Sequence, residues 1–353
     1  MLEAKLAAIV VLSGLVGYAV LGGADFGSGI WSALASGPRK EQQRNALYKA
    51  IGPVWETNNV WLVFAVVVLF MAFPPAFGDL FIALLVPITI GIVGIIFRGA
   101  AFAFRNFAKE AGAPTAPVHG ITFSIASVIA PFFFGVALGA TAASEIEVEQ
   151  SFVASGLYEP WLRPVPILFG LTAVAICGYL TMNYMTTRSG GELREDFRRQ
   201  GLISGAAVAA LSIATLALAR WEAPDFWELW QRPAPLAMSG VALLAGLASM
   251  FVLWRRWCPL APVTGGGAMA LLVATWGVIQ YPYFIVPGDD IFQAATNDAM
   301  LRASLISLVV GAVIIVPALL LLYLSFVGEP AEEKEGEAYS PPTVVPLSFA
   351  LVK

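Results

Sequence analysis

The chain has 353 residues, of which 58% are hydrophobic and 12% are charged. A soluble domain of this length would carry about twice that share of charged residues, so the composition indicates an integral membrane protein. The net charge of −4 gives no reason to expect a nucleic-acid partner.

Nine apolar stretches of about 20 residues or more are long enough to cross a bilayer. They run approximately over 6–34, 50–73, 79–104, 119–142, 164–187, 200–220, 234–254, 266–286 and 303–327. The first continues into glycine-rich sequence without a small-residue cleavage site, so we expect a retained span and not a signal peptide. We therefore predict an all-α membrane domain over 1–327, followed by an acidic, proline-containing cytoplasmic tail over 328–353.

The distribution of lysine and arginine predicts how these spans are oriented. The basic residues gather after the first, third, fifth and seventh stretches, whereas the alternate connections are rich in acids. Together with the tail, one side holds 15 of the 20 basic residues. The positive-inside rule then predicts an N-terminus outside and a C-terminus in the cytoplasm.

Two carboxyl groups lie within the first two stretches. Asp25 stands in the glycine-rich segment 22–29, and Glu56 stands one turn into the segment 52–61, which opens on Pro53. A carboxylate deep in a span costs up to about 3 kcal/mol, so such a residue is seldom accidental. We expect the two helices to be antiparallel neighbours, with both acids near one short cytoplasmic loop.

Two such carboxyls suit a relay that takes protons from the cytoplasm. The alternative is that they cap helices or hydrogen-bond between helices, and the helix dipole alone would stabilise Glu56. Gly23 and Gly27 are four residues apart, a spacing that allows close helix contact. Arg98 lies well before its loop, so it either snorkels, the interpretation we favour, or pairs with Glu56 or Asp25.

Metal chemistry in this chain is limited by its few ligand residues. Cys177 and Cys258 lie far apart and form neither a metal spacing nor a disulfide framework. His119 is the only histidine, and neither a haem held by two histidines nor a copper centre can be built from one. We therefore expect no metal site in this chain.

Five segments together resemble subunit II of the cytochrome bd-type quinol oxidases. Their order, spacing and helix placement agree with that family from the first predicted helix to the ninth. The most specific segment is the Trp-acid-x-Asn-x-x-Trp block from Trp55 to Trp61. The segments are GADFGSG (23–29), GPVWETNNVW (52–61), AFP (72–74), FRGAAFAFR (97–105) and QYPY (280–283).

The resemblance implies a bacterial inner-membrane respiratory complex that oxidises quinol and reduces oxygen to water without pumping protons. In that family, subunit II has nine helices, arranged as two four-helix bundles plus one peripheral helix. It packs against subunit I as a pseudo-symmetric heterodimer in the lipid bilayer. Subunit I carries the haems, two of b type and one of d type, so this chain is expected to hold none. Small accessory subunits and a structural quinone in subunit II stay open.

The resemblance also assigns roles to residues. It puts the acids of a cytoplasmic proton path at Asp25 and Glu56, and a tryptophan near an oxygen route at Trp61. The supporting polar and aromatic residues are Trp55, Asn58, Asn59 and Arg98. Two departures stand out: Gly22 replaces an acid found in many relatives, and Glu56 stands where many have Asp. The second change keeps a titratable group but moves it by one methylene.

Two other functions are compatible with the residues alone. The chain could be a secondary transporter or channel that uses Asp25 and Glu56 as a proton- or cation-coupling site. However, nine spans do not divide evenly into two inverted repeats. It could also be a purely structural assembly subunit in which both acids serve packing.

Overall fold

The computed structural model describes residues 1–51, 55–110, 117–143, 146–149 and 152–327. The side chains of Trp55 and Glu56 are not among the described residues. The predicted tail over 328–353 lies entirely outside the described ranges. The elements are α1 (Leu2–Gly17), η1 (Tyr18–Gly22), α2 (Gly23–Leu34), α3 (Lys40–Ile51), α4 (Trp55–Ala72), α5 (Pro74–Ala83), α6 (Leu85–Glu110), α7 (Pro117–Ala140), β1 (Val148–Glu149), β2 (Phe152–Val153), α8 (Pro164–Arg188), α9 (Gly191–Glu222), α10 (Pro224–Trp230), α11 (Pro233–Trp254), η2 (Cys258–Leu260), α12 (Ala261–Gln280) and α13 (Asp298–Val327).

The described chain is almost entirely helical, which confirms the predicted all-α class. Among the described residues, eight helical runs are long and apolar enough to cross a membrane, and the first is the 33-residue run Leu2–Leu34 formed by α1, η1 and α2. The stretch predicted over 50–73 contributes a shorter apolar helix, Asn58–Ala72, within α4. Beside the helices, the described residues include a hairpin of two-residue strands, in which Val148 of β1 lies opposite Val153 of β2.

The connection between the helices that carry Asp25 and Glu56 is itself a helix, so the prediction of one short loop is wrong. Its 12 residues, KEQQRNALYKAI, form α3 and are mostly polar. The apolar Leu47 anchors α3 because it packs into a buried cluster with Met182 and Phe197. A helix with one apolar side and a charged remainder suits the surface of a membrane better than its interior.

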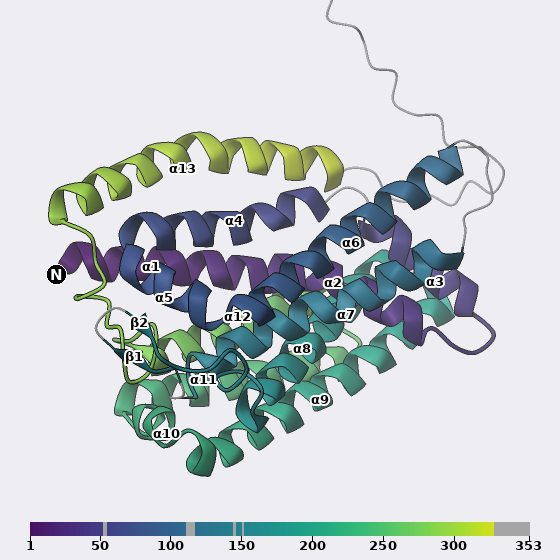
Figure 1. Ribbon diagram of the computed structural model, residues 1–353. Coiled ribbons are helices and arrows are strands. Elements are labelled where there is room, and N and C mark those ends of the chain that lie inside the picture. The colour runs from purple at the N-terminus through teal and green to yellow at the C-terminus, as the bar shows by residue number, and fades with distance from the viewer. Residues whose placement is uncertain (52–54, 111–116, 144–145, 150–151, 328–353) are drawn as a thin grey trace, which may run out of the picture. The chain divides into compact units, whose positions relative to one another are not determined.

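Helices that follow one another in the chain also pack side by side: α6 on α7, α7 on α8, α8 on α9, and α11 on α12. The first helical run contacts two sets of neighbours, because α1 packs on α4 whereas α2 packs on α7 and α8. Figure 1 shows α3 at one end of this unit, and α10 with β1 and β2 at the other.

Small residues allow α2 to approach α8 closely. A side chain at Gly27 would collide with the carbonyl group of Cys177 and the hydroxyl group of Thr181, and one at Gly23 would meet Leu180 at 3.1 Å. This geometry confirms the close helix contact predicted from the spacing of the two glycines. It fixes the backbone on either side of Asp25 against a neighbouring helix.

The chain divides into two units, Met1–Val313 and Ile314–Lys353. The first unit contains every element through the first part of α13, together with all the residues discussed below. Of the second unit, the description covers the rest of α13, up to Val327. The boundary predicted at residue 327 falls at the end of the described chain and stays a prediction.

Candidate functional site

Asp25 lies in the first turn of α2, directly after the five-residue π-helical turn η1. A π turn inserts an extra residue into a helix and is frequent at functional sites. Asp25 is buried, with 6% of its surface exposed, and its Oδ2 accepts a 2.6 Å hydrogen bond from Nδ2 of Asn58 on α4. Because η1 runs directly into α2, this carboxylate does not cap a helix; it links two helices.

Arg98 on α6 is the second charged group of this site, and it is buried with 4% of its surface exposed. Its Nη2 donates a 2.9 Å hydrogen bond to the main-chain oxygen of Asp25, and its Nε donates to Oγ of Ser127 at 3.2 Å. The guanidinium carbon lies 4.8 Å from the ring centre of Phe26 and 5.1 Å from that of Phe123. The favoured prediction that Arg98 snorkels is therefore wrong, because neutral acceptors and aromatic faces hold the cation inside the protein.

The pairing predicted for Arg98 takes a different form from a direct ion pair. The hydrogen bond from Arg98 reaches the Asp25 main chain, whereas the hydrogen bond to the Asp25 carboxylate comes from the neutral amide of Asn58. The two charges still attract each other through space. The Asp25 carboxylate therefore lies near the Arg98 cation, but the described hydrogen bond to its oxygen comes from the amide of Asn58.

A hydroxyl group on α8 supports the backbone just before Asp25. Oγ1 of Thr181 lies 2.6 Å from the carbonyl oxygen of Ala24 and 2.9 Å from that of Cys177 in its own helix. This shared hydroxyl proton ties α2 to α8 where the glycine contact brings them together. Asp25 is therefore held by α4, α6 and α8 at once.

Several residues of this site could not be recognised from the sequence pattern. Tyr18 in η1 packs edge-on against Phe26 and Phe134, with ring centres 6.3 Å apart in each pair. Its hydroxyl group is buried and has no hydrogen-bond partner among the described residues. Ser127 on α7 accepts from Arg98 and itself donates to the carbonyl oxygen of Phe123 at 2.7 Å. An apolar run with one serine or tyrosine gives no indication of such contacts.

The other predicted site residues lie along α4. Asn59 is half-buried beside Asn58, and the side chains of Trp55 and Glu56 lie outside the described residues. Trp61 is half-buried and lies so close to Gly17 of α1 that a side chain there would meet its ring at 2.9 Å. The structure therefore joins Asp25, Asn58 and Arg98 in one site, whereas Trp61 contacts the preceding helix α1.

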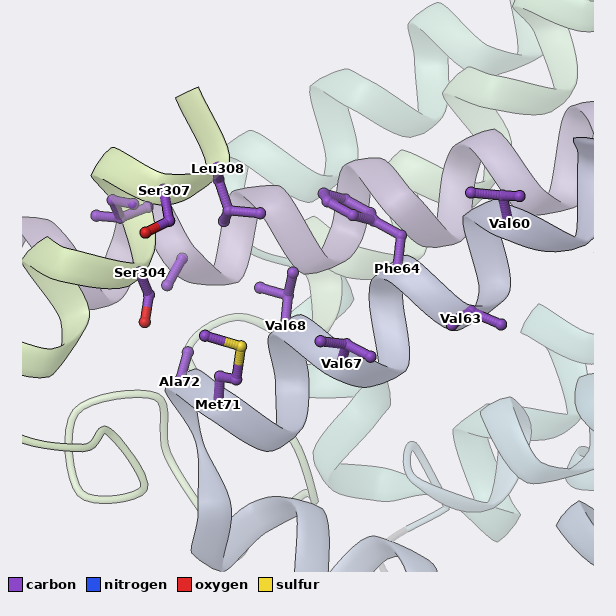
Figure 2. A pocket seen from close by; sticks show the side chains of 12 residues that line it. Val60, Val63, Phe64, Val67, Val68, Met71, Ala72, Ser304, Ser307 and Leu308 are labelled. Carbon is purple, nitrogen blue, oxygen red and sulfur yellow. The ribbon is translucent and has the colours of Figure 1, made fainter. Parts of the chain in front are cut away.

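A separate apolar groove of about 370 Å³ lies between α1, α4 and the first part of α13. Figure 2 shows the side chains that line it, including Val60, Phe64 and Val68 from α4. Its polar groups are the hydroxyls of Ser304 and Ser307. With no charged side chain in its lining, the groove is suited to apolar contact and not to proton chemistry.

Residues that could ligate a metal are few and scattered in the described part of the chain. No three His, Cys, Asp or Glu side chains gather at one point in the described part of the chain. His119 lies beside Phe104, with ring centres 5.9 Å apart, and does not line the groove. The groove offers one thioether, that of Met71, which by itself makes no paired axial ligand set.

Comparisons with known proteins agree over most of the chain. The family model described as cytochrome bd terminal oxidase subunit II matches residues 4–326. The cytochrome bd ubiquinol oxidase subunit 2 of Bacillus subtilis (strain 168) is 27% identical over 273 residues, which cover 77% of this chain and 78% of the relative. The cytochrome bd-I ubiquinol oxidase subunit 2 of Escherichia coli (strain K12) is 27% identical over 182 residues, or 51% and 47% of the two chains.

The fold has a counterpart among solved structures. A chain of the bd oxidase from Geobacillus thermodenitrificans superposes with a TM-score of 0.72 at 21% sequence identity, covering 93% of this chain and 99% of that one. Since the family model spans nearly the whole sequence, this chain belongs to the cytochrome bd terminal oxidase subunit II family and is a subunit of a quinol oxidase.

Proposed function

We propose that this chain is the haem-free subunit of the oxidase, which supports a haem-bearing subunit I and conducts protons from the cytoplasm toward oxygen reduction through Asp25 and Glu56. The observation that carries this proposal is the buried Asp25 carboxylate held by Asn58 of α4, the helix that also bears Glu56. A buried carboxyl group inside an apolar helix is costly, which makes it a candidate for a functional role such as a proton path.

The partners of Asp25 suit a group that gains and loses a proton. A side-chain amide has both donors and an acceptor, so Asn58 can bond to a carboxylate through its N–H or to a carboxylic acid through its oxygen. Arg98 places a positive charge near the site, but its described hydrogen bonds go to the main-chain carbonyl oxygen of Asp25 and to Oγ of Ser127. The carboxyl group is therefore oriented without being locked into a bidentate ion pair.

The role of Glu56 is argued from its position in the chain. It precedes Asn58 by two residues on α4, a rise of roughly 3 Å along the helix axis. The two residues therefore belong to the same turn of α4. We expect the two acids to titrate as one coupled pair, with Glu56 nearer to the cytoplasm.

The architecture proposed for this role has nine spans, with α4 as the short one. The apolar part of α4, Asn58–Ala72, is roughly 22 Å long, which is less than a hydrocarbon core of about 30 Å. The first run, α4, α6 and α7 would form one four-helix bundle, and α8, α9, α11 and α12 the other, with α13 peripheral. The N-terminus would lie outside, and 328–353 in the cytoplasm, because one side holds 15 of the 20 basic residues.

The proposed contact with subunit I is the apolar side of α4. Val60, Val63 and Val67 are exposed there and line the groove shown in Figure 2. Trp61 packs edge-on against Phe64 of the same groove, with ring centres 6.2 Å apart. An apolar passage from the groove to Trp61 would be suited to oxygen. This contact would place the partner beside the helix that holds both the proton path and the oxygen path.

The test is the turnover of assembled oxidase that carries Asp25→Asn or Glu56→Gln. We expect each variant to lower quinol-dependent oxygen consumption at least tenfold, with haem content from the optical spectrum unchanged. Glu41→Gln is the matched control, because Glu41 is an exposed acid on α3. Wild-type turnover in both variants would refute the proton path. Loss of haem in both Asp25→Asn and Asp25→Glu would instead support a purely structural role.

A further inference from the structure

A second pair of carboxyl groups lies at the end of the unit opposite α3. Asp79 is on α5 and is buried, with 8% of its surface exposed. Asp289 is in the segment 281–297, which connects α12 to α13, and its carboxyl group lies close enough to that of Asp79 for the two to interact. The two residues are 210 positions apart in the sequence, and only the fold brings them together.

This contact needs a proton. The Oδ2 atom of Asp289 is buried and, with both groups ionised, has no hydrogen-bond partner among the described residues. Two carboxylates can only accept hydrogen bonds, whereas a carboxylic acid can donate one to a carboxylate. A single shared proton therefore turns a repulsive contact into a hydrogen bond and satisfies the buried oxygen.

The surrounding charges also favour a proton at this site. The groups that act on Asp289 are Asp79 on α5 and its own neighbour Asp290, and both are acidic. Burial, and then the Asp79 carboxylate, raise the pKa of Asp289 to about 6. Asp290 is already engaged, because its Oδ1 accepts hydrogen bonds from the main-chain N–H groups of Phe292 at 2.6 Å and Gln293 at 2.8 Å.

The segment that carries Asp289 is packed against the rest of the unit. The N–H of Val286 donates to the carbonyl oxygen of Thr141 at 3.1 Å, and the N–H of Thr296 donates to that of Ala72 at 2.9 Å. Ile285 is fully buried in a cluster that includes residues of α5. Asp289 adds a side-chain interaction with α5 to these contacts between the segment and the rest of the unit.

We propose that Asp79 and Asp289 share one proton and form a pH-sensitive latch that fastens segment 281–297 to α5. The proton sits on one carboxyl group and is donated to the other, and no other reactant is needed. A divalent cation is a poorer occupant, because Ca²⁺ takes six to eight oxygen ligands and Asp290 is committed to the backbone. The latch concerns stability at the outer end and is independent of the proposed path through Asp25.

The direction of the pH dependence follows from the raised pKa. The pKa of Asp289 is about 6 in the folded chain and about 3.9 in an unfolded one. The folded state therefore binds more protons between these two values, so the stabilisation is complete below about pH 4 and is lost as pH rises through about 6. Acidification of the outer face closes the latch, and neutral pH opens it.

The experiment is hydrogen–deuterium exchange of segment 281–297 in the assembled wild-type oxidase between pH 5 and pH 8, corrected for intrinsic exchange rates. We expect the protection of this segment to fall several-fold as pH rises through about 6. In Asp289→Asn the amide donates to Asp79 at every pH, so protection should be high at pH 8 and independent of pH. Glu228→Gln, which removes an exposed acid from α10 nearby, should behave like the wild type.

Three outcomes would overturn the proposal. One is a wild-type segment whose protection does not change with pH, and another is an Asp289→Asn variant that keeps the wild-type pH step. The third is protection restored at pH 8 by added Ca²⁺ in the wild type but not in Asp289→Asn, which would make the pair a cation site. If the variant fails to assemble, infrared spectra of the wild type decide, because one carboxylic acid must appear as pH falls through about 6.

Discussion

Replacement of Gly27 by alanine tests whether the contact between α2 and α8 holds the Asp25 site together. The added methyl group would collide with the carbonyl of Cys177 and the hydroxyl of Thr181, so the helices must separate. Such overpacking costs about 1–3 kcal/mol. The hydrogen bond from Thr181 to Ala24 would add about 1 kcal/mol if it broke. Alanine gains about 1 kcal/mol over glycine in a helix, so we expect a net loss of about 1–3 kcal/mol.

The measurement is denaturant unfolding of the purified oxidase, followed by helical circular dichroism and by haem retention. The matched control is Gly246→Ala on α11, because a methyl group there meets nothing within 4 Å and should be neutral or stabilising. Thr181→Val in the same assay separates the hydrogen bond from the collision. Equal stability of the Gly27→Ala and Gly246→Ala proteins would show that the contact between α2 and α8 has room for a methyl group, and would refute this prediction.

Three further predictions concern other contacts. Arg98→Met should lower the free energy of unfolding by about 3–5 kcal/mol and reduce the yield of assembled oxidase, because it leaves Asp25 without its buried cation; Arg98→Lys should recover part of that yield. Gln280→Leu should lower the free energy of unfolding by about 2 kcal/mol, because the carbonyl groups of Thr141, in a buried bond, and of Phe284, in a part-buried bond, lose the donor that Nε2 provides. Arg39→Gln should cost less than about 1 kcal/mol, and the cost should shrink at high salt, because its ion pairs with α9 are partly exposed.

The sequence was sufficient for most of the architecture and for the family. Apolar stretches long enough to span a bilayer indicate helices whatever their neighbours are, and the part of the chain that the structure describes contains eight such helical runs. The spacing of Gly23 and Gly27 indicated a close helix contact, because this pattern lies within one helix and can be recognised without knowing which helix is the neighbour. The resemblance to subunit II is confirmed by the family model over residues 4–326, and this overturns the transporter alternative.

What the sequence could not predict depends on which helices become neighbours. Arg98 looked like a snorkelling residue because its acceptors, Asp25 and Ser127, lie in other helices. The same limit applies to Asp79 and Asp289, which are 210 positions apart in the sequence and come together only in the fold. The helix α3 was missed for a local reason: a polar amphipathic segment has no apolar run to mark it.

The π-helical turn η1 limits which changes of length the first span tolerates. Before the turn, Gly14 and Gly17 face Ala65 and Trp61 of α4, whereas after it Gly27 faces α8. The extra residue shifts the helical phase by about 100°, so one continuous span presents its small residues in two directions. Removal of a single residue between 18 and 22 would cancel that phase shift and rotate one half of the span away from its partner. The length of this turn, more than the identity of its residues, keeps Asp25 in register with α4.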